Sequence, residues 1–89
     1  MPKLAKRKTA TDQPLTGMNW LREQMEILEM SSLEQVAQTV GINRGNLYRY
    51  FAFETRPSIA LLPDLCYALS VDVNTLLRAL EVIDQDEKL

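Results

Sequence analysis

The 89-residue chain has no histidine, a single cysteine, only three glycines and no long apolar run. Without histidine, it lacks the side chain that most often acts as a general base or activates a nucleophile. It also has no glycine-rich phosphate loop and no paired acid constellation. We therefore expect no enzymatic activity, no cofactor, no metal site and no small-molecule ligand.

The single cysteine and the short apolar runs limit the cellular compartments in which the protein can work. Cys66 cannot form an internal disulfide, and its helical spacing to Leu62 and Leu69 predicts a buried small hydrophobic residue. No apolar run approaches the roughly 18 residues of a membrane span, and the charged amino terminus lacks the apolar stretch of a signal peptide. We expect one small, soluble, cytoplasmic domain with no membrane partner.

Charge is distributed unevenly along the chain. The formal net charge is −2. From residue 78 onward four acids outnumber two bases, and residues 11–77 carry eight acids against four arginines, three of which lie between residues 44 and 56. The first ten residues have four bases and no acid: Lys3, Lys6, Arg7 and Lys8. Positive charge is therefore concentrated at the amino terminus and in one central segment.

That central segment predicts two short helices joined at a glycine. Apolar residues follow helical spacing and then stop: Leu33, Val36, Ala37 and Val40. Gly41 can adopt the left-handed conformation that ends a helix. Ser32 is predicted to cap the first helix, with Gln35 reaching back to its amide as in a capping box. Asn43 caps the second helix, which starts at about Arg44.

On a helical wheel, the second of these helices has an apolar and a polar side. The apolar side, which must meet the core, consists of Leu47, Tyr50 and Phe51. The outer side consists of Arg44, Gly45, Tyr48, Arg49 and Ala52, with Asn46 on its flank. The major groove of B-DNA is about 12 Å wide and admits one α-helix, and arginine matches the paired acceptors of guanine. This face is therefore suited to double-stranded DNA.

From about Trp20 to Leu77, some two thirds of the chain, the sequence resembles the Cro/C1-type (XRE-like) helix-turn-helix family. The matching positions are Ala37, Gly41, Ile42, Arg44, Leu47 and Arg49, then Pro57 and Ser58, then Ala68 to Asp72, then Leu76 and Leu77. The resemblance implies an all-α, compact five-helix bundle with a lambda-repressor-like DNA-binding domain. It divides the chain into a basic flexible arm and linker (1–17), the domain (18–78) and an acidic extension (79–89).

The resemblance also implies roles for individual residues. Base contacts carry over to the early positions of the third helix: Arg44, Gly45, Tyr48 and Arg49. Phosphate contacts carry over to the loop residues Thr55 and Arg56, and we also expect them from the capping and flanking residues Ser32, Asn43 and Asn46. The arm would add phosphate contacts through Lys3, Lys6, Arg7 and Lys8, weakened by salt. The alternative for the arm is a terminus that only keeps the protein soluble.

Three positions depart from the family pattern. Leu33 stands where many members carry a phosphate-binding glutamine, and Phe51 replaces a common glutamate. Pro63 falls where the fourth helix should be continuous. Either that helix is kinked, or residues 59–62 form a separate turn and Pro63 occupies the first helical position.

The first and last helices are predicted from their apolar stripes. The first runs from Met18 or Asn19 to Met30 and buries Trp20, Leu21, Met25, Ile27 and Leu28. The last is capped by Asp72 and continues through Leu80 to Ile83, beyond what a five-helix core needs to cover. The extra apolar residues predict a homodimer seam made of Leu77, Leu80, Val82 and Ile83. Alternatively, they fold back on the first helix.

Together these patterns predict a sequence-specific DNA-binding transcriptional regulator, associated with the nucleoid. We expect a homodimeric repressor that reads a palindromic operator through the major groove, because one short helix reads too few bases for a selective site. The alternative is a protein-interaction module, such as an antitoxin that binds a toxin or polymerase through its acidic carboxyl-terminal region. The acidic overall balance and the glutamate-rich first helix favour that alternative.

Overall fold

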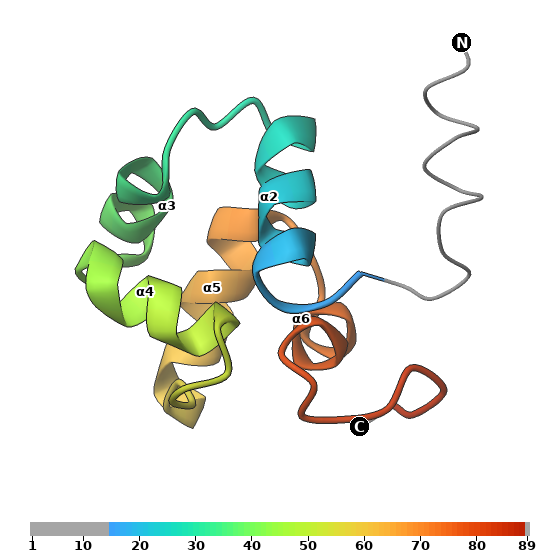
Figure 1. The fold of residues 1–89 in the computed structure, drawn as a ribbon. Coiled ribbons are helices and arrows are strands. Elements are labelled where there is room, and N and C mark those ends of the chain that lie inside the picture. Colours follow the sequence, from blue (N-terminus) through green and yellow to red (C-terminus); the bar gives the residue numbers. More distant parts are fainter. Residues whose placement is uncertain (1–14, 89) are drawn as a thin grey trace, which may run out of the picture.

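The computed structural model describes residues 15–88, which form five α-helices and one 3₁₀ turn (Figure 1). These described residues contain no strand, and the predicted all-α fold of five helices is confirmed. The elements in chain order are α2 (Gly17–Ile27), α3 (Leu33–Val40), α4 (Arg44–Phe51), η1 (Ile59–Leu61), α5 (Leu62–Leu69) and α6 (Val73–Ala79).

The caps of α3 and α4 explain why both helices start where the sequence predicts. The Ser32 hydroxyl accepts a 3.2 Å hydrogen bond from the amide of Gln35, and the Asn43 side chain accepts one of 2.7 Å from the amide three residues on. Gly41 ends α3 with φ 91°. The capping box is shifted by one residue, because the Gln35 side chain accepts from the amide of Ser31 at 3.0 Å.

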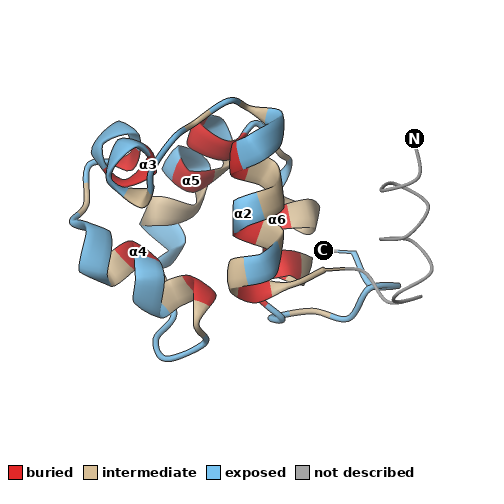
Figure 2. Ribbon diagram, turned by 45° about the horizontal axis from the view of Figure 1, so that its top comes forward, coloured by how far each residue is buried: buried red, intermediate tan, exposed pale blue. Residues whose placement is uncertain are grey.

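A single apolar core joins the five helices. Figure 2 shows the buried residues on the inward sides of the helices. Leu47 and Phe51 from α4 are fully buried, and Tyr50 is partly buried against the same core. The ring of Trp20 stacks on Phe51 with centroids 5.9 Å apart. Each buried leucine or phenylalanine contributes about 1.5 to 3 kcal/mol, so this packing holds α4 in place.

The region of Pro63 follows the second of the two predicted alternatives. Residues Ile59–Leu61 form a separate 3₁₀ turn, and α5 begins at Leu62. Pro63 therefore lies in the first turn of α5, where its missing amide has no helical partner to lose. A kinked fourth helix is excluded.

Helix α2 differs from its prediction at both ends. It begins at Gly17, inside the predicted linker, and ends at Ile27 rather than Met30. Leu21 and Met25 define its buried side. Ile27 is 64% exposed, and its predicted place in the buried stripe is wrong, because two residues beyond Met25 a helix points away from the core.

Helix α6 is shorter than predicted. It ends at Ala79 rather than reaching Ile83, and Leu80 follows as its cap. The next residue, Glu81, adopts the left-handed conformation with φ 59°, which stops the helix. This turn leaves Leu77 and Leu80 buried within the single chain. The expectation that Leu80 lies beyond what the core covers is therefore wrong.

No single helix within residues 15–88 is long and apolar enough to cross a membrane. Only the segments Ile59–Leu69 and Val73–Ala79 taken together pass that test of length and composition, and they are bent by 99°. Both segments contribute leucines to the core described above.

Two glycines with positive φ hold different kinds of position. Gly17 is buried, with φ 61°, and a Cβ there would lie 2.7 Å from the ring of Phe53 and 2.9 Å from the carbonyl oxygen of Phe51. Gly41 has φ 91°, but a Cβ would meet nothing within 4 Å. The start of α2 is thus pressed against the chain that leaves α4, which only glycine permits.

Alanine substitutions at these glycines should have unequal costs. Gly17→Ala should lower the free energy of unfolding by about 2 to 5 kcal/mol, because left-handed strain of about 1 to 2 kcal/mol adds to overpacking of about 1 to 3 kcal/mol. Gly41→Ala should cost only the strain, about 1 to 2 kcal/mol. Urea denaturation of the two variants tests this ranking, and equal losses would contradict it.

Candidate nucleic-acid interface

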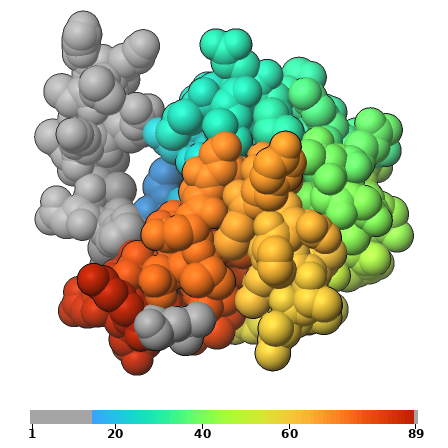
Figure 3. All heavy atoms as spheres, turned by 180° about the vertical axis from the view of Figure 1, so that it is seen from behind, coloured from blue at the N-terminus to red at the C-terminus, as the bar shows by residue number. Residues whose placement is uncertain are grey.

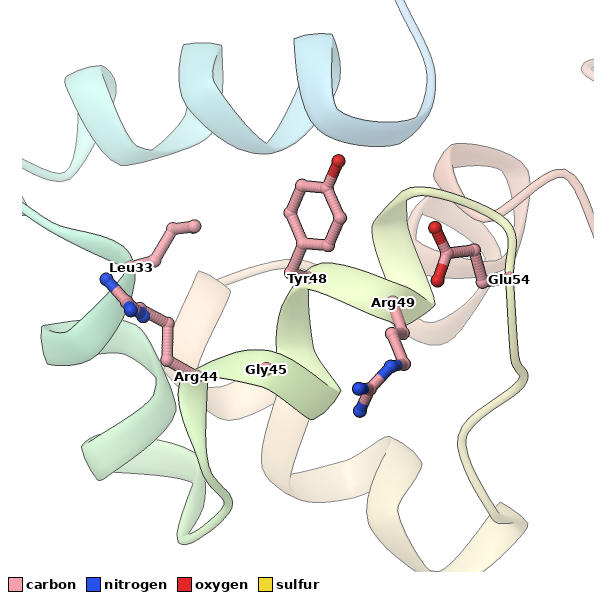
Figure 4. Close-up of a pocket in the computed structure, with 6 residues that line it drawn as sticks. All are labelled: Leu33, Arg44, Gly45, Tyr48, Arg49 and Glu54. Carbon is pink, nitrogen blue, oxygen red and sulfur yellow. The ribbon is translucent and has the colours of Figure 1, made fainter.

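The outer side of α4 is an open, partly basic surface (Figure 4). The four predicted base-contacting residues all lie on it, and all four are exposed. They line a hollow of about 460 Å³ together with one residue from α3 and one from the loop after α4. The lining residues are Leu33, Arg44, Gly45, Tyr48, Arg49 and Glu54.

The large side chains of this hollow extend in different directions. In Figure 4, Arg44 extends toward Leu33, and the Tyr48 ring extends toward α2. Arg49 extends to the other side of α4. Both arginines are exposed, but their guanidinium groups extend to different sides of the helix and are spread along it. Such a spread suits contacts at separate positions along a groove.

Arg49 is positioned by its own helix. Its Nη1 donates a 3.3 Å hydrogen bond to the side-chain oxygen of Asn46. The same Nη1 would lie 3.8 Å from a Cβ added at Gly45. The arginine therefore folds back over the first turn of α4, and the lack of a side chain at Gly45 leaves the helix backbone open beside it.

The two N-cap residues combine a structural role with an exposed position. Ser32 and Asn43 are both exposed, and each uses a side-chain oxygen to accept a helix amide. A serine hydroxyl and an asparagine amide keep donor hydrogens when their oxygen accepts. Both residues therefore still have hydrogens that a phosphate can accept.

The loop after α4 is tied to the far end of the chain. An Nη atom of Arg56 donates a hydrogen bond to the carbonyl oxygen of Leu80, which caps α6. A cation at a helix carboxyl terminus satisfies a free carbonyl and is favoured by the helix dipole. Arg56 thus anchors this loop and has further donors for a phosphate. Its neighbour Thr55 is exposed.

Glu54 is a member of the hollow that the sequence analysis did not assign to the site. There it was only one of eight acids in the central segment. Its position three residues after the end of α4 was the available signal. A carboxylate among arginines repels phosphate, but it can accept from the amino group of cytosine.

Outside this surface, two side chains have shifted pKa values. Partial burial, and the nearby charge of Asp72, raise the pKa of the Cys66 thiol. The thiol therefore stays protonated near neutral pH, and Cys66 packs against the core. The backbone amide and hydroxyl of Thr75 lower the pKa of Asp72, the N-cap of α6. Within residues 15–88 no group of three potential metal ligands is found.

The structure describes the predicted seam residues near the carboxyl end of the chain but not the predicted arm residues near the amino end. The arm residues Lys3, Lys6, Arg7 and Lys8 lie outside the described residues. Where the described chain begins, the Thr16 hydroxyl donates a 2.8 Å hydrogen bond to the carboxylate of Glu81. Of the predicted seam, Val82 is exposed and Ile83 is partly buried.

Comparison with known proteins adds a family to this geometry. A model of the Cro/C1-type HTH DNA-binding domain matches residues 20–80, more than half of the chain. Comparisons with curated proteins and with solved structures gave no significant match. The matched region contains all of α3, α4, α5 and α6 together with the exposed basic face. The chain belongs to the Cro/C1-type helix-turn-helix family of DNA-binding domains.

Proposed function

We propose that this DNA-binding transcriptional regulator is a homodimeric repressor that reads a palindromic operator through the major groove. The observation that carries the proposal is the outer face of α4. Two exposed arginines flank a glycine there, while Leu47 and Phe51 on the opposite side are fully buried. A repressor of this kind works where the genome is, in the cytoplasm on the nucleoid.

In this proposal, Arg44 and Arg49 each make bidentate contacts to guanine, and Tyr48 packs on a thymine methyl group or bonds a phosphate. Gly45 lets the helix backbone approach the base edges. The phosphate contacts come from residues at the rim of this face and from the arm: Ser32, Asn43, Asn46, Thr55, Arg56, Lys3, Lys6, Arg7 and Lys8. A second copy about 34 Å away would read the other half of the operator.

Replacing Arg49 should change which bases are preferred. Arg49→Ala should remove about 1 to 3 kcal/mol of discrimination at one base position of each half-site and leave the fold intact. A selection from random-sequence duplexes, run with both proteins, measures this. Arg22→Ala is the matched control, because Arg22 is exposed on α2 and outside the hollow. Unchanged base preference in Arg49→Ala would reject the assigned role.

Gly45→Ala should separate stability from binding. An added Cβ makes only ordinary contacts, 3.4 Å to Asn43 and 3.8 Å to Arg49, and alanine favours a helix by up to about 1 kcal/mol over glycine. The melting temperature should therefore rise or hold. Affinity for the selected duplex should fall, because the methyl group stands on the groove-facing side. An affinity equal to that of the native protein would show that close approach at this residue is not needed.

The arm should contribute affinity without sequence preference. Removing residues 1–8 should weaken binding to every duplex and reduce the slope of log K against log salt by about 0.9 for each cation that contacts a phosphate. Titrations of one duplex at several salt concentrations measure the slope. If the truncated and full-length chains have the same slope, the arm only aids solubility.

The interaction module is a second candidate function. The exposed acidic residues after α6 favour it: Glu81, Asp84, Asp86 and Glu87. A toxin or polymerase with a basic surface would bind there. A mobility-shift assay with labelled duplex at low salt separates the two functions. A DNA-binding repressor shifts the duplex, whereas a module that binds only protein does not.

A further inference from the structure

We propose that Leu33 reads a methyl group at C5 of a pyrimidine, next to the guanine that Arg44 contacts. Thymine and 5-methylcytosine both carry this methyl group at the same place in the major groove. The inference rests on the proposed function and adds one reading residue, with its chemistry, to that site. Leu33 belongs to α3, whereas the base contacts proposed above all come from α4.

Leu33 stands at the start of α3 and at the edge of the hollow on α4. It is the first residue of the helix, directly after the exposed N-cap Ser32. It packs against the core, but part of its surface remains accessible and lines the hollow. Among the six described residues that line this hollow, Leu33 is the only aliphatic one. A largely polar surface therefore has one apolar position at the α3 side.

The chemistry of leucine limits what it can recognise on DNA. An aliphatic side chain has no hydrogen-bond donor or acceptor for a phosphate or a polar base edge. The apolar group that bases present in the major groove is the methyl group of thymine, which cytosine lacks. A contact between leucine and this methyl group removes both from water. Because leucine does not sense the oxygen or amino group at C4, it treats thymine and 5-methylcytosine alike.

Arg44 determines which base carries the methyl group. In Figure 4, Arg44 extends toward Leu33 from the first position of α4, while Arg49 extends to the other side of the helix. Neighbouring bases of one strand are about 3.4 Å apart along the helix axis. A guanine bound by Arg44 therefore places an adjacent base beside Leu33. The expected site contains a methylated pyrimidine next to that guanine.

The charges around Leu33 allow a duplex to approach. The described residues that line the hollow include two arginines and one carboxylate, which leave it one positive charge. Figure 3 shows α4, in light green, and the segment after α6, in red, at opposite edges of the molecule. The acidic residues of that segment therefore do not oppose phosphates at the hollow. The major groove can then lie over α4 with Leu33 at its side.

The test changes single methyl groups of the DNA and starts from the duplex that the native protein selects. Each thymine is replaced in turn by uracil, which differs only in lacking the C5 methyl group. A parallel pair of duplexes carries cytosine or 5-methylcytosine at the position beside the guanine, and Arg44→Ala identifies that guanine by its lost preference. Affinities are measured for the native protein and the variants, and circular dichroism checks folding.

Three variants separate the methyl contact from general effects. Leu33→Ala removes the contact. Leu33→Met keeps an apolar side chain of similar volume and should retain it. Ile27→Ala is the matched control, because Ile27 is an exposed aliphatic residue at the end of α2 and outside the hollow. The uracil comparison also works with the native protein alone, so it does not depend on the folding of any variant.

For the native protein, uracil beside the guanine of Arg44 should weaken binding about fourfold, the effect of burying one carbon group of this size. At the same position, 5-methylcytosine should bind about fourfold more tightly than cytosine. Leu33→Met and Ile27→Ala should keep both ratios, and Leu33→Ala should bring both close to one. A ratio above one in the thymine pair alone would assign the methyl group to thymine.

Two results would overturn this inference and leave the proposed function standing. One is equal affinity of the native protein for thymine and uracil, and for 5-methylcytosine and cytosine, beside that guanine. The other is a methyl preference that persists undiminished in folded Leu33→Ala. If the native protein selects no duplex at all, the proposed function fails, and this inference fails with it.

Discussion

The burial of Leu47 and Phe51 is the packing on which the exposed outer face of α4 depends. Helix α4 has only eight residues, and an isolated helix of that length is not stable in water. Its inner side therefore has to be held by the core, including the ring of Trp20 that stacks on Phe51. Because side-chain direction follows backbone position in a helix, this inner packing also sets where Arg44 and Arg49 point.

Features set by local chemistry could be predicted from the sequence. The caps at Ser32, Asn43 and Asp72 and the left-handed end at Gly41 involve residues at most four apart, so sequence spacing reveals them. The ends of α2 and α6 could not be predicted in this way. They depend on how the chain turns back to the core, as Leu80 does, and an apolar pattern alone does not distinguish that turn from one more turn of helix.

In the candidate site too, local features could be predicted from the sequence, and contacts between distant segments could not. A helical wheel placed five residues of this segment on one outer side, and the structure leaves four of them exposed and Ala52 partly buried. Wheel geometry cannot see contacts between distant segments. It missed Glu54 at the edge of the hollow, and it could not show that Arg56 bonds to Leu80, which is 24 positions away. Nor could it show that Gly17 lies against Phe53.

The bond between Arg56 and Leu80 links the loop after α4 to the end of α6. A phosphate that competed for the guanidinium would weaken this bond, and a movement of Leu80 would change its strength as well. Two ligands that act on one shared contact are thermodynamically linked, and the factor by which one alters the affinity of the other is the same in both directions. Through this arginine, a change at the loop after α4 would be felt at the end of α6, and a change at the end of α6 would be felt at that loop.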